Sequence, residues 1–223
     1  WLGMGAEFSV LGRYENNQDG IVIELRLTDI HEGRMLLGRR YRGPFDQHEK
    51  MIKKFCDEAI YKLSGVPGIS TTSISFVSDV SGFKEIWLAD VLGEKIRQVT
   101  QHRHLAVSPR FSPDGQQLAY TTYHRGNPDL YMTDLAQSKT TRPISRRQGL
   151  NMAPGWAPNG KTLAITLSKD DNPDLYLINT KGEIIERLTK NAGLNVSPTW
   201  SPDGSRIAFV SDRSGSPQIY IMD

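Results

Sequence analysis

Three similar turns, 44 or 45 residues apart, constrain the fold of this chain more than any other feature of its sequence. The copies are SPRFSPDGQQLAY (108–120), APGWAPNGKTLAI (153–165) and SPTWSPDGSRIAF (197–209). Pro-Asp-Gly or Pro-Asn-Gly favours a tight turn, because proline presets φ and glycine accepts a positive φ. The apolar runs beside each turn predict a β-hairpin, and two further runs follow in the same period. Four short strands in about 44 residues predict one blade of a β-propeller.

The repeat starts near residue 73 and is incomplete at both ends. Segments 73–79, 85–90 and 95–100 match the second, third and fourth strands of a blade, so that successive units contain 3, 4, 4 and 3 strands. Propellers close into rings of about four to eight blades. We therefore predict an incomplete propeller over residues 67–223, with about three and a half blades, in a fragment of a longer protein.

Residues 1–66 contain no such repeat and predict a separate N-terminal α/β domain, of which this chain holds the C-terminal part. Runs of alternating apolar residues predict antiparallel strands at 6–14, 20–29 and 34–42, with one apolar face. An apolar stripe over 45–63 predicts one helix that covers this face. The predicted fold class is therefore α+β, as a β-β-β-α unit, followed by an all-β propeller.

The composition and the motifs give no sign of catalytic, cofactor or metal chemistry. The net charge of +2 and the lack of a dense basic block argue against nucleic acid as a partner. No apolar run approaches the roughly 20 residues of a membrane span. The single cysteine, Cys56, excludes an internal disulfide and a cysteine-based metal site. Neither G-x-S-x-G nor H-E-x-x-H occurs, so we expect no catalytic residues, no cofactor and no metal.

Two polar segments have alternative interpretations. His102 and His104 alternate along one segment, and we interpret them as a solvent-exposed pair. The acidic segment KDDNPD (169–174) has ligands suited to Ca²⁺, but it occupies the hairpin position of YHRGNPD and DRSGSPQ in the sister repeats. A plain turn is the preferred interpretation, because Asp, Asn and Pro are turn-forming residues.

The loops that lead into the innermost strand of each predicted blade are the candidate binding site. They are RHLAVSP, GLNMAPG and GLNVSPT, at the predicted mouth of the propeller channel. Exposed apolar side chains around one mouth suggest a surface for a protein partner. Packing of the same side chains between blades is the open alternative, because leucines are usually buried. The apolar residues concerned are Leu105, Val107, Leu150, Met152, Leu194 and Val196.

The blades and the segment before them together resemble the TolB family, periplasmic propeller proteins of the Tol–Pal system of Gram-negative bacteria. The blade pattern SPxFSPDGxxLAY…DLYxxD is shared with propeller peptidases. The lead-in IELRLTDIHEGRMLLGRRYRG…CDEAIYKLSGVPGISTTSISFVSD, joined to such blades, is much more specific. The likeness covers essentially the whole chain, although Lys54-Phe55 stands where the family usually has Ala-His.

The resemblance implies a non-enzymatic periplasmic adaptor with six blades when complete, whose signal peptide is absent from this chain. Its implied partners are the lipoprotein Pal over one propeller face, TolA, and outer-membrane proteins. Its implied role is to maintain outer-membrane integrity and constriction at cell division. The family's Pal-facing loops match Leu150, Asn151, Met152, Ala153, Val196 and Ser197. The full candidate set is Leu105, Val107, Leu150, Asn151, Met152, Ala153, Leu194, Asn195, Val196 and Ser197.

Two other classes of protein remain as alternatives at this point. The first is the propeller domain of a serine peptidase or another hydrolase, with its catalytic domain outside this chain. The second is a lectin-like or metal-binding propeller. The β-β-β-α unit before the blades favours the adaptor over the hydrolase, and a calcium titration followed by melting temperature would reveal the metal-binding propeller.

Overall fold

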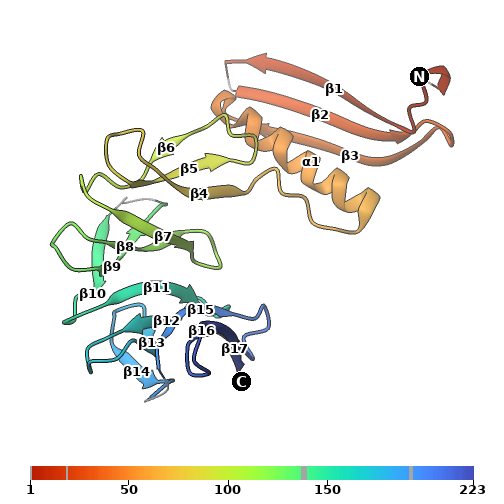
Figure 1. The fold of residues 1–223 in the computed structure, drawn as a ribbon. Helices are drawn as coiled ribbons and strands as arrows, with labels where there is room; N and C mark the ends of the chain where they lie inside the picture. The colour runs from red at the N-terminus through yellow and green to blue at the C-terminus, as the bar shows by residue number, and fades with distance from the viewer. Residues whose placement is uncertain (1, 19, 137–139, 191–192) are drawn as a thin grey trace. The chain divides into compact units, whose positions relative to one another are not determined.

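The computed structural model describes residues 2–18, 20–136, 140–190 and 193–223, and it divides into two compact units (Figure 1). The first unit contains the chain up to Ile74 together with Ala89–Lys95. The second unit contains Ser75–Leu88 and Ile96–Asp223. The domain boundary between residues 66 and 67 remains a prediction.

A three-stranded antiparallel sheet with the order β1-β2-β3 forms the base of the first unit. Its residues alternate along the central strand, and Ile21, Ile23, Leu25 and Leu27 are buried on one face. Helix α1 covers this face with Met51, Phe55 and Ala59. The elements are η1 (Leu2–Met4), β1 (Phe8–Asn17), β2 (Gly20–Asp29), β3 (Arg34–Gly43), η2 (Phe45–Gln47) and α1 (His48–Ser64).

Helix α1 ends at Gly65, whose φ of 72° lies in the left-handed region that glycine adopts without strain. The Gly65 N–H donates to the Tyr61 carbonyl oxygen at 2.9 Å, so one of the last helical carbonyls is satisfied. The predicted β-β-β-α unit is therefore confirmed.

Four antiparallel sheets of 3, 4, 4 and 3 strands follow, as the repeat predicts. The first two are β4 (Ser73–Ser78), β5 (Glu85–Asp90), β6 (Arg97–Gln98), and β7 (Ala106–Phe111), β8 (Gln117–Thr122), β9 (Asp129–Asp134), β10 (Thr141–Ser145). The last two are β11 (Asn151–Trp156), β12 (Thr162–Leu167), β13 (Asp174–Asn179), β14 (Ile184–Arg187), and β15 (Asn195–Trp200), β16 (Ile207–Ser211), β17 (Gln218–Met222). Below, these sheets are called the first to fourth blades. Strand β11 contacts both β7 and β15, so the first strands of successive blades lie side by side (Figure 1).

Buried apolar layers join neighbouring blades. One cluster includes Met132 of the second blade and Trp156 and Ile165 of the third, and the Trp156 indole N–H donates to the Arg110 carbonyl oxygen at 3.2 Å. A second cluster places Ile86 of the first blade against side chains of the second. Because burying one large apolar side chain contributes roughly 1.5–3 kcal/mol, these layers stabilise the stack of blades. The predicted fold class, a β-β-β-α unit followed by propeller blades, is confirmed.

Candidate functional site

The candidate site lies at one end of the blades, which we call the mouth end. Successive strands of an antiparallel sheet run in opposite directions. The loop before the first strand and the turn between the second and third strands therefore lie at the same end of a blade. The Pro-Asp-Gly and Pro-Asn-Gly turns lie at the opposite end. Loops 101–105, 123–128, 146–150 and 168–173 thus belong to the mouth end of the second and third blades.

The structure brings all ten predicted binding residues together at the starts of three adjacent strands, β7, β11 and β15. Their exposure differs, however. Leu105 is 37% exposed and Ser197 is exposed, whereas Asn151 and Asn195 are fully buried. The remaining six, Val107, Leu150, Met152, Ala153, Leu194 and Val196, are half-buried. This intermediate exposure leaves both partner binding and packing between blades as explanations for the apolar members.

A hollow of about 580 Å³ lies beside the first of these strands. Leu105 and Val107 form part of its wall, and the first blade contributes a carboxylate and an ammonium group, Asp79 and Lys84. Concave sites that are apolar with a few polar groups are the usual form of a binding pocket. Two candidate residues therefore border a space that a partner's side chain can enter.

Each first strand contains the same backbone irregularity. Ser108, Ala153 and Ser197 have φ angles of 55°, 54° and 56°, and each precedes a proline. At each place the ladder has two residues opposite one, which defines a β-bulge. Non-glycine residues in the left-handed region are uncommon. The repeated Ser/Ala-Pro dipeptide therefore encodes a bulge that shapes the mouth end, which the sequence analysis did not predict.

Asn151 fixes the loop before β11. Its Oδ1 accepts hydrogen bonds from Ser145 Oγ at 2.5 Å and from the Arg147 N–H at 2.9 Å. Its Nδ2 donates to the carbonyl oxygens of Arg147 and Gly149 at 2.7 and 3.2 Å, and to that of Pro128 at 3.3 Å. A buried amide with this many partners is costly to disturb. The side chain holds the loop in place for its neighbours.

Asn195 performs the same task before β15, and it does so together with a buried carboxylate. Its Nδ2 donates to Asp174 Oδ1 at 3.1 Å and to the Gly193 carbonyl oxygen at 2.8 Å. Its Oδ1 accepts a hydrogen bond from Arg213 at 2.8 Å. The third and fourth blades are thus joined through one amide group.

The acidic segment 169–174 forms a turn in which the carboxylates of Asp170 and Asp174 accept hydrogen bonds from donors within the blades. Asp170 accepts hydrogen bonds from Lys169 at 2.8 Å and from the Tyr176 hydroxyl at 2.7 Å, and these bonds lower its pKa. Burial raises the pKa of Asp174, but hydrogen bonds from Arg187 and Thr189 outweigh it and hold the pKa below its ordinary value. Within the described ranges, no three His, Cys, Asp or Glu side chains converge as metal ligands.

The predicted solvent-exposed histidine pair is wrong for one of its members. His104 is exposed, but His102 is half-buried, stacks on His124 with ring centres 4.7 Å apart, and lies 2.9 Å from the Tyr120 hydroxyl. Burial lowers the pKa of His102, and the neighbouring His124 lowers it further. The chain turns at Arg103, whose φ is 57°, so alternation along the sequence does not continue in space.

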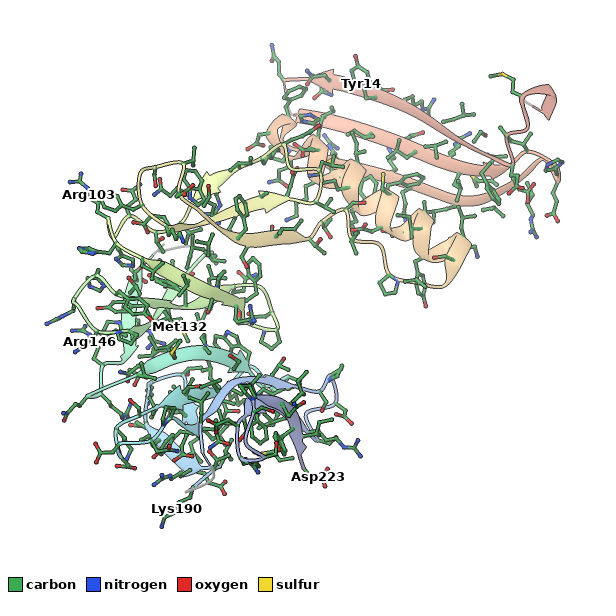
Figure 2. All side chains as sticks on the ribbon, viewed as in Figure 1. Tyr14, Arg103, Met132, Arg146, Lys190 and Asp223 are labelled. Carbon is green, nitrogen blue, oxygen red and sulfur yellow. The ribbon has the colours of Figure 1, made fainter. Side chains whose placement is uncertain are left out.

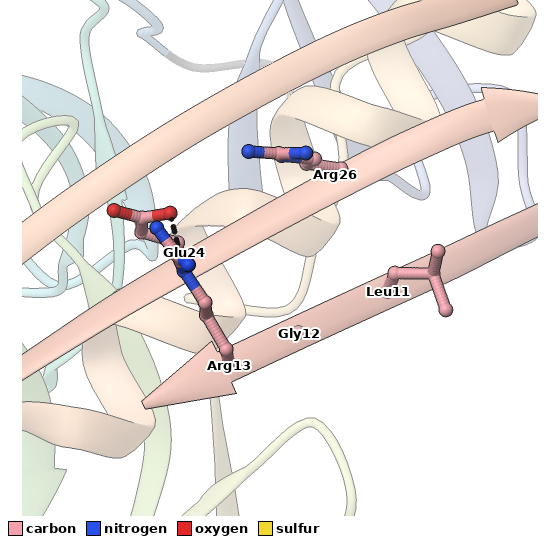
Figure 3. Close-up of a pocket in the computed structure, with 5 residues that line it drawn as sticks. All are labelled: Leu11, Gly12, Arg13, Glu24 and Arg26. Atoms are coloured by element: carbon pink, nitrogen blue, oxygen red, sulfur yellow. Dashed lines mark hydrogen bonds and ion pairs between the residues drawn. The ribbon is translucent and has the colours of Figure 1, made fainter. Parts of the chain in front are cut away.

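Two further hollows lie in the first unit. The one in Figure 3 lies on β1 and β2, where Arg13 Nε donates to Glu24 Oε2 at 2.8 Å. The other measures about 460 Å³ and is lined mainly by apolar residues of β1, β2 and α1. Neither hollow is lined by a nucleophile and a base together. None of the helices that the structure describes has the length and apolar character needed to span a membrane.

Comparison with known proteins points to one family. Residues 60–223 match the family described as the TolB beta propeller domain. The Tol-Pal system protein TolB of Desulfotalea psychrophila is 51% identical over 145 residues, which are 65% of this chain and 33% of that protein. The protein of the same name from Desulfosudis oleivorans is 44% identical over 142 residues, 63% of this chain and 32% of that protein. The matched region thus spans about a third of these relatives.

The fold agrees with this relationship. A crystal structure of TolB from Acinetobacter baumannii superposes on 100% of this chain and 57% of its own, with a TM-score of 0.89 and 29% identity. The match includes the β-β-β-α unit as well as the blades, which is the combination that the sequence pattern singles out. The chain belongs to the TolB beta propeller domain family.

Proposed function

We propose that this chain is part of a non-enzymatic adaptor of the Tol–Pal system, which binds the lipoprotein Pal at the mouth end of its blades. Membership of the TolB family supports a place in the Tol–Pal system. The names of similar relatives include that system. The proposal extends to a periplasmic location, to TolA and outer-membrane proteins as further partners, and to a role in outer-membrane integrity during cell division.

One observation supports this location of the binding site. Met152 and Val196 lie at equivalent positions of adjacent strands, each directly before a bulge, and each keeps part of its side chain exposed. Interface cores are built from apolar side chains of this kind, surrounded by a polar rim. Asn151 and Asn195 support the site by fixing the loops, because their own amides are fully hydrogen-bonded inside the blades.

Replacing Met152 or Val196 by glutamate tests the proposal. If these side chains face the partner, we expect Pal affinity to fall at least about tenfold, or 1.4 kcal/mol, in isothermal titration. The melting temperature should change little, because surface substitutions usually stay within about 0.5 kcal/mol. If they pack between blades instead, the buried glutamate should destabilise the fold by a few kcal/mol.

The matched control is Ile185→Glu, which places the same charge on an exposed residue of β14, outside the mouth loops. It should leave both Pal affinity and melting unchanged. Wild-type affinity in correctly folded Met152→Glu and Val196→Glu variants would remove this surface from the interface.

A further inference from the structure

Exposed positive charges gather at the mouth end of the second blade. Arg103 lies in the loop before β7, Arg125 in the turn between β8 and β9, and Arg146 directly after β10; all three are exposed. Exposed His104 adjoins the first of them. Figure 2 labels Arg103 and Arg146, whose side chains point outward. Among the residues that the structure describes, no carboxylate forms an ion pair with any of these three guanidinium groups.

The blade orders the side chain of Arg146 and the backbone of Arg103. The Arg146 guanidinium carbon lies 5.6 Å from the centre of the Tyr131 ring, a cation–π distance. Arg103 has a φ of 57°, and its N–H donates to the buried Glu85 carboxylate at 2.6 Å. Groups that are already ordered lose less entropy when a partner binds. The cluster is therefore partly organised before any ligand arrives.

Two acidic side chains, Glu85 and Asp129, lie next to the cluster, and both are buried. Asp129 is 5% exposed, and its carboxylate has no hydrogen-bond partner within the described part of the chain. Burial raises its pKa, and the nearby charges of Arg146 and Arg125 oppose that rise. Three exposed guanidinium groups therefore face at most two negative charges, both of them buried, and the surface stays positive.

The turns between the second and third strands of the other three blades carry acids. The corresponding turn of the third blade carries Asp170 and Asp171, and its cations Lys169 and Arg187 are paired with Asp170. The turns of the first and fourth blades carry acids as well, Asp79 and Asp212, beside the cations Lys84 and Arg213. A flat anionic membrane laid on the mouth end would meet these acids. A partner with a limited footprint meets only the positive sector, and this favours a protein.

We propose that Arg103, Arg125 and Arg146 bind a carboxylate-rich segment of the protein that occupies the mouth end. This inference rests on the proposed function, because it adds the charge of the partner to the same site. Arginine binds carboxylates through two parallel hydrogen bonds, which favours it over lysine for this task. Exposed Leu105 is only two residues from Arg103, so that an apolar area and a basic edge adjoin, as in the core and rim of an interface.

Charges at the rim of an interface act mainly on the association rate and on its salt dependence. The first probe is a fluorescent hexaglutamate peptide, measured by anisotropy at about 20 mM and about 200 mM salt, because screening separates charge effects from other contacts. We expect the double variant Arg125→Gln/Arg146→Gln to bind the peptide about tenfold more weakly at low salt. Its melting temperature should stay unchanged.

The matched control is Lys161→Gln/Lys181→Gln, which removes two exposed positive charges from turns at the opposite end of the third blade. It should bind hexaglutamate like the wild type. An equal loss in both double variants, or no loss in either, would overturn the proposal. Loss of binding to phosphatidylglycerol vesicles without loss of peptide binding would also overturn it, in favour of a membrane surface.

Pal serves as the second probe and separates this inference from the proposed function. We expect Arg125→Gln/Arg146→Gln to slow Pal association about five- to tenfold at low salt, and much less at high salt. If Met152→Glu abolishes Pal binding while the arginine variant associates at the wild-type rate, the inference fails and the proposed function stands. If the wild type binds hexaglutamate through the arginines but does not bind Pal, the proposed function fails.

Discussion

The second and third blades share one strand pattern, but the carboxylate of an aspartate at the same position has hydrogen-bond partners in the third blade and, within the described ranges, none in the second. Asp174 begins β13 with no exposed surface, and it accepts hydrogen bonds from Arg187 at 2.5 Å and from Thr189 at 2.7 Å. Asp129 begins β9 and is almost as buried, yet its carboxylate has no such partner among the described residues. The same position is therefore a structural anchor in one blade and a lone charge in the next.

The difference arises at two positions of the second blade. Ser145, at the place of Thr189, donates its hydroxyl to Asn151. Pro143, which pairs with Tyr131 as Arg187 pairs with Tyr176 in the third blade, has no side-chain donor. The repeat thus preserves the backbone, while individual side chains determine which charged groups have partners inside a blade. Charged groups without an ion-pair partner inside the described part of the blade, such as the guanidinium groups of Arg125 and Arg146, remain available to a binding partner.

The largest expected effect comes from removing the anchored acid. Asp174→Ala removes one acceptor from Arg187 and one from Asn195, and breaking a buried ion pair in this way costs about 3 kcal/mol or more. Asp129→Ala removes no hydrogen bond and should cost well under half of that. Urea denaturation of both variants measures the contrast. Equal losses would mean that Asp129 has partners in solution and that the two blades are alike.

The second expected effect is a difference in pH dependence between the two blades. Burial lowers the pKa of both His102 and His124, so below about pH 6.5 the unfolded chain binds more protons there than the folded chain. Their contribution to stability is complete above that pH and decreases as the pH falls toward the lowered values. The lowered pKa of Asp174 affects stability at a lower pH, because the contribution of Asp174 to stability disappears only as the pH falls below about 4.

We therefore expect the free energy of unfolding to fall between about pH 7 and 5.5, by up to about 1.4 kcal/mol per pH unit for each histidine. The double variant His102→Gln/His124→Gln should lose this slope and keep the later loss below about pH 4. Denaturant midpoints over a pH series give both slopes, so that a direct cost of the glutamines does not affect the comparison. An unchanged slope between pH 7 and 5.5 would contradict the role of the pair.

The sequence was sufficient for the features that depend on short segments. Strand alternation and Pro-Asp-Gly turns are local properties, and they predicted the strand numbers of all four blades as well as the helix after β3. They also predicted which loops meet at the mouth end, because a repeat places equivalent residues at equivalent positions.

Features that depend on contacts between distant segments were not predicted. His102 turns inward because Arg103 bonds to Glu85, which is 18 residues earlier. Asn151 and Asn195 look like exposed loop residues in the sequence, but each amide joins segments of two blades. The β-bulge could have been predicted, since a proline after Ser or Ala at three equivalent positions is visible in the sequence. Only the structure shows that those residues have positive φ.

The smallest expected effect separates the two acids most cleanly. Asp129→Asn keeps the shape of the side chain but removes a buried charge that lacks hydrogen bonds, and burying an unpaired charge is unfavourable. Because the raised pKa of Asp129 means that folding disfavours its charged form, stability at pH 7 should stay equal or rise by about 0.5 kcal/mol. Hexaglutamate should bind slightly more tightly, since the positive surface loses one of its two nearby negative charges and keeps only that of Glu85. The same change in the third blade, Asp174→Asn, should instead destabilise the fold by weakening its pair with Arg187. Parallel urea titrations decide between these outcomes: a clear loss of stability in Asp129→Asn would show that its carboxylate is a structural anchor after all, and the contrast between the two blades would then disappear.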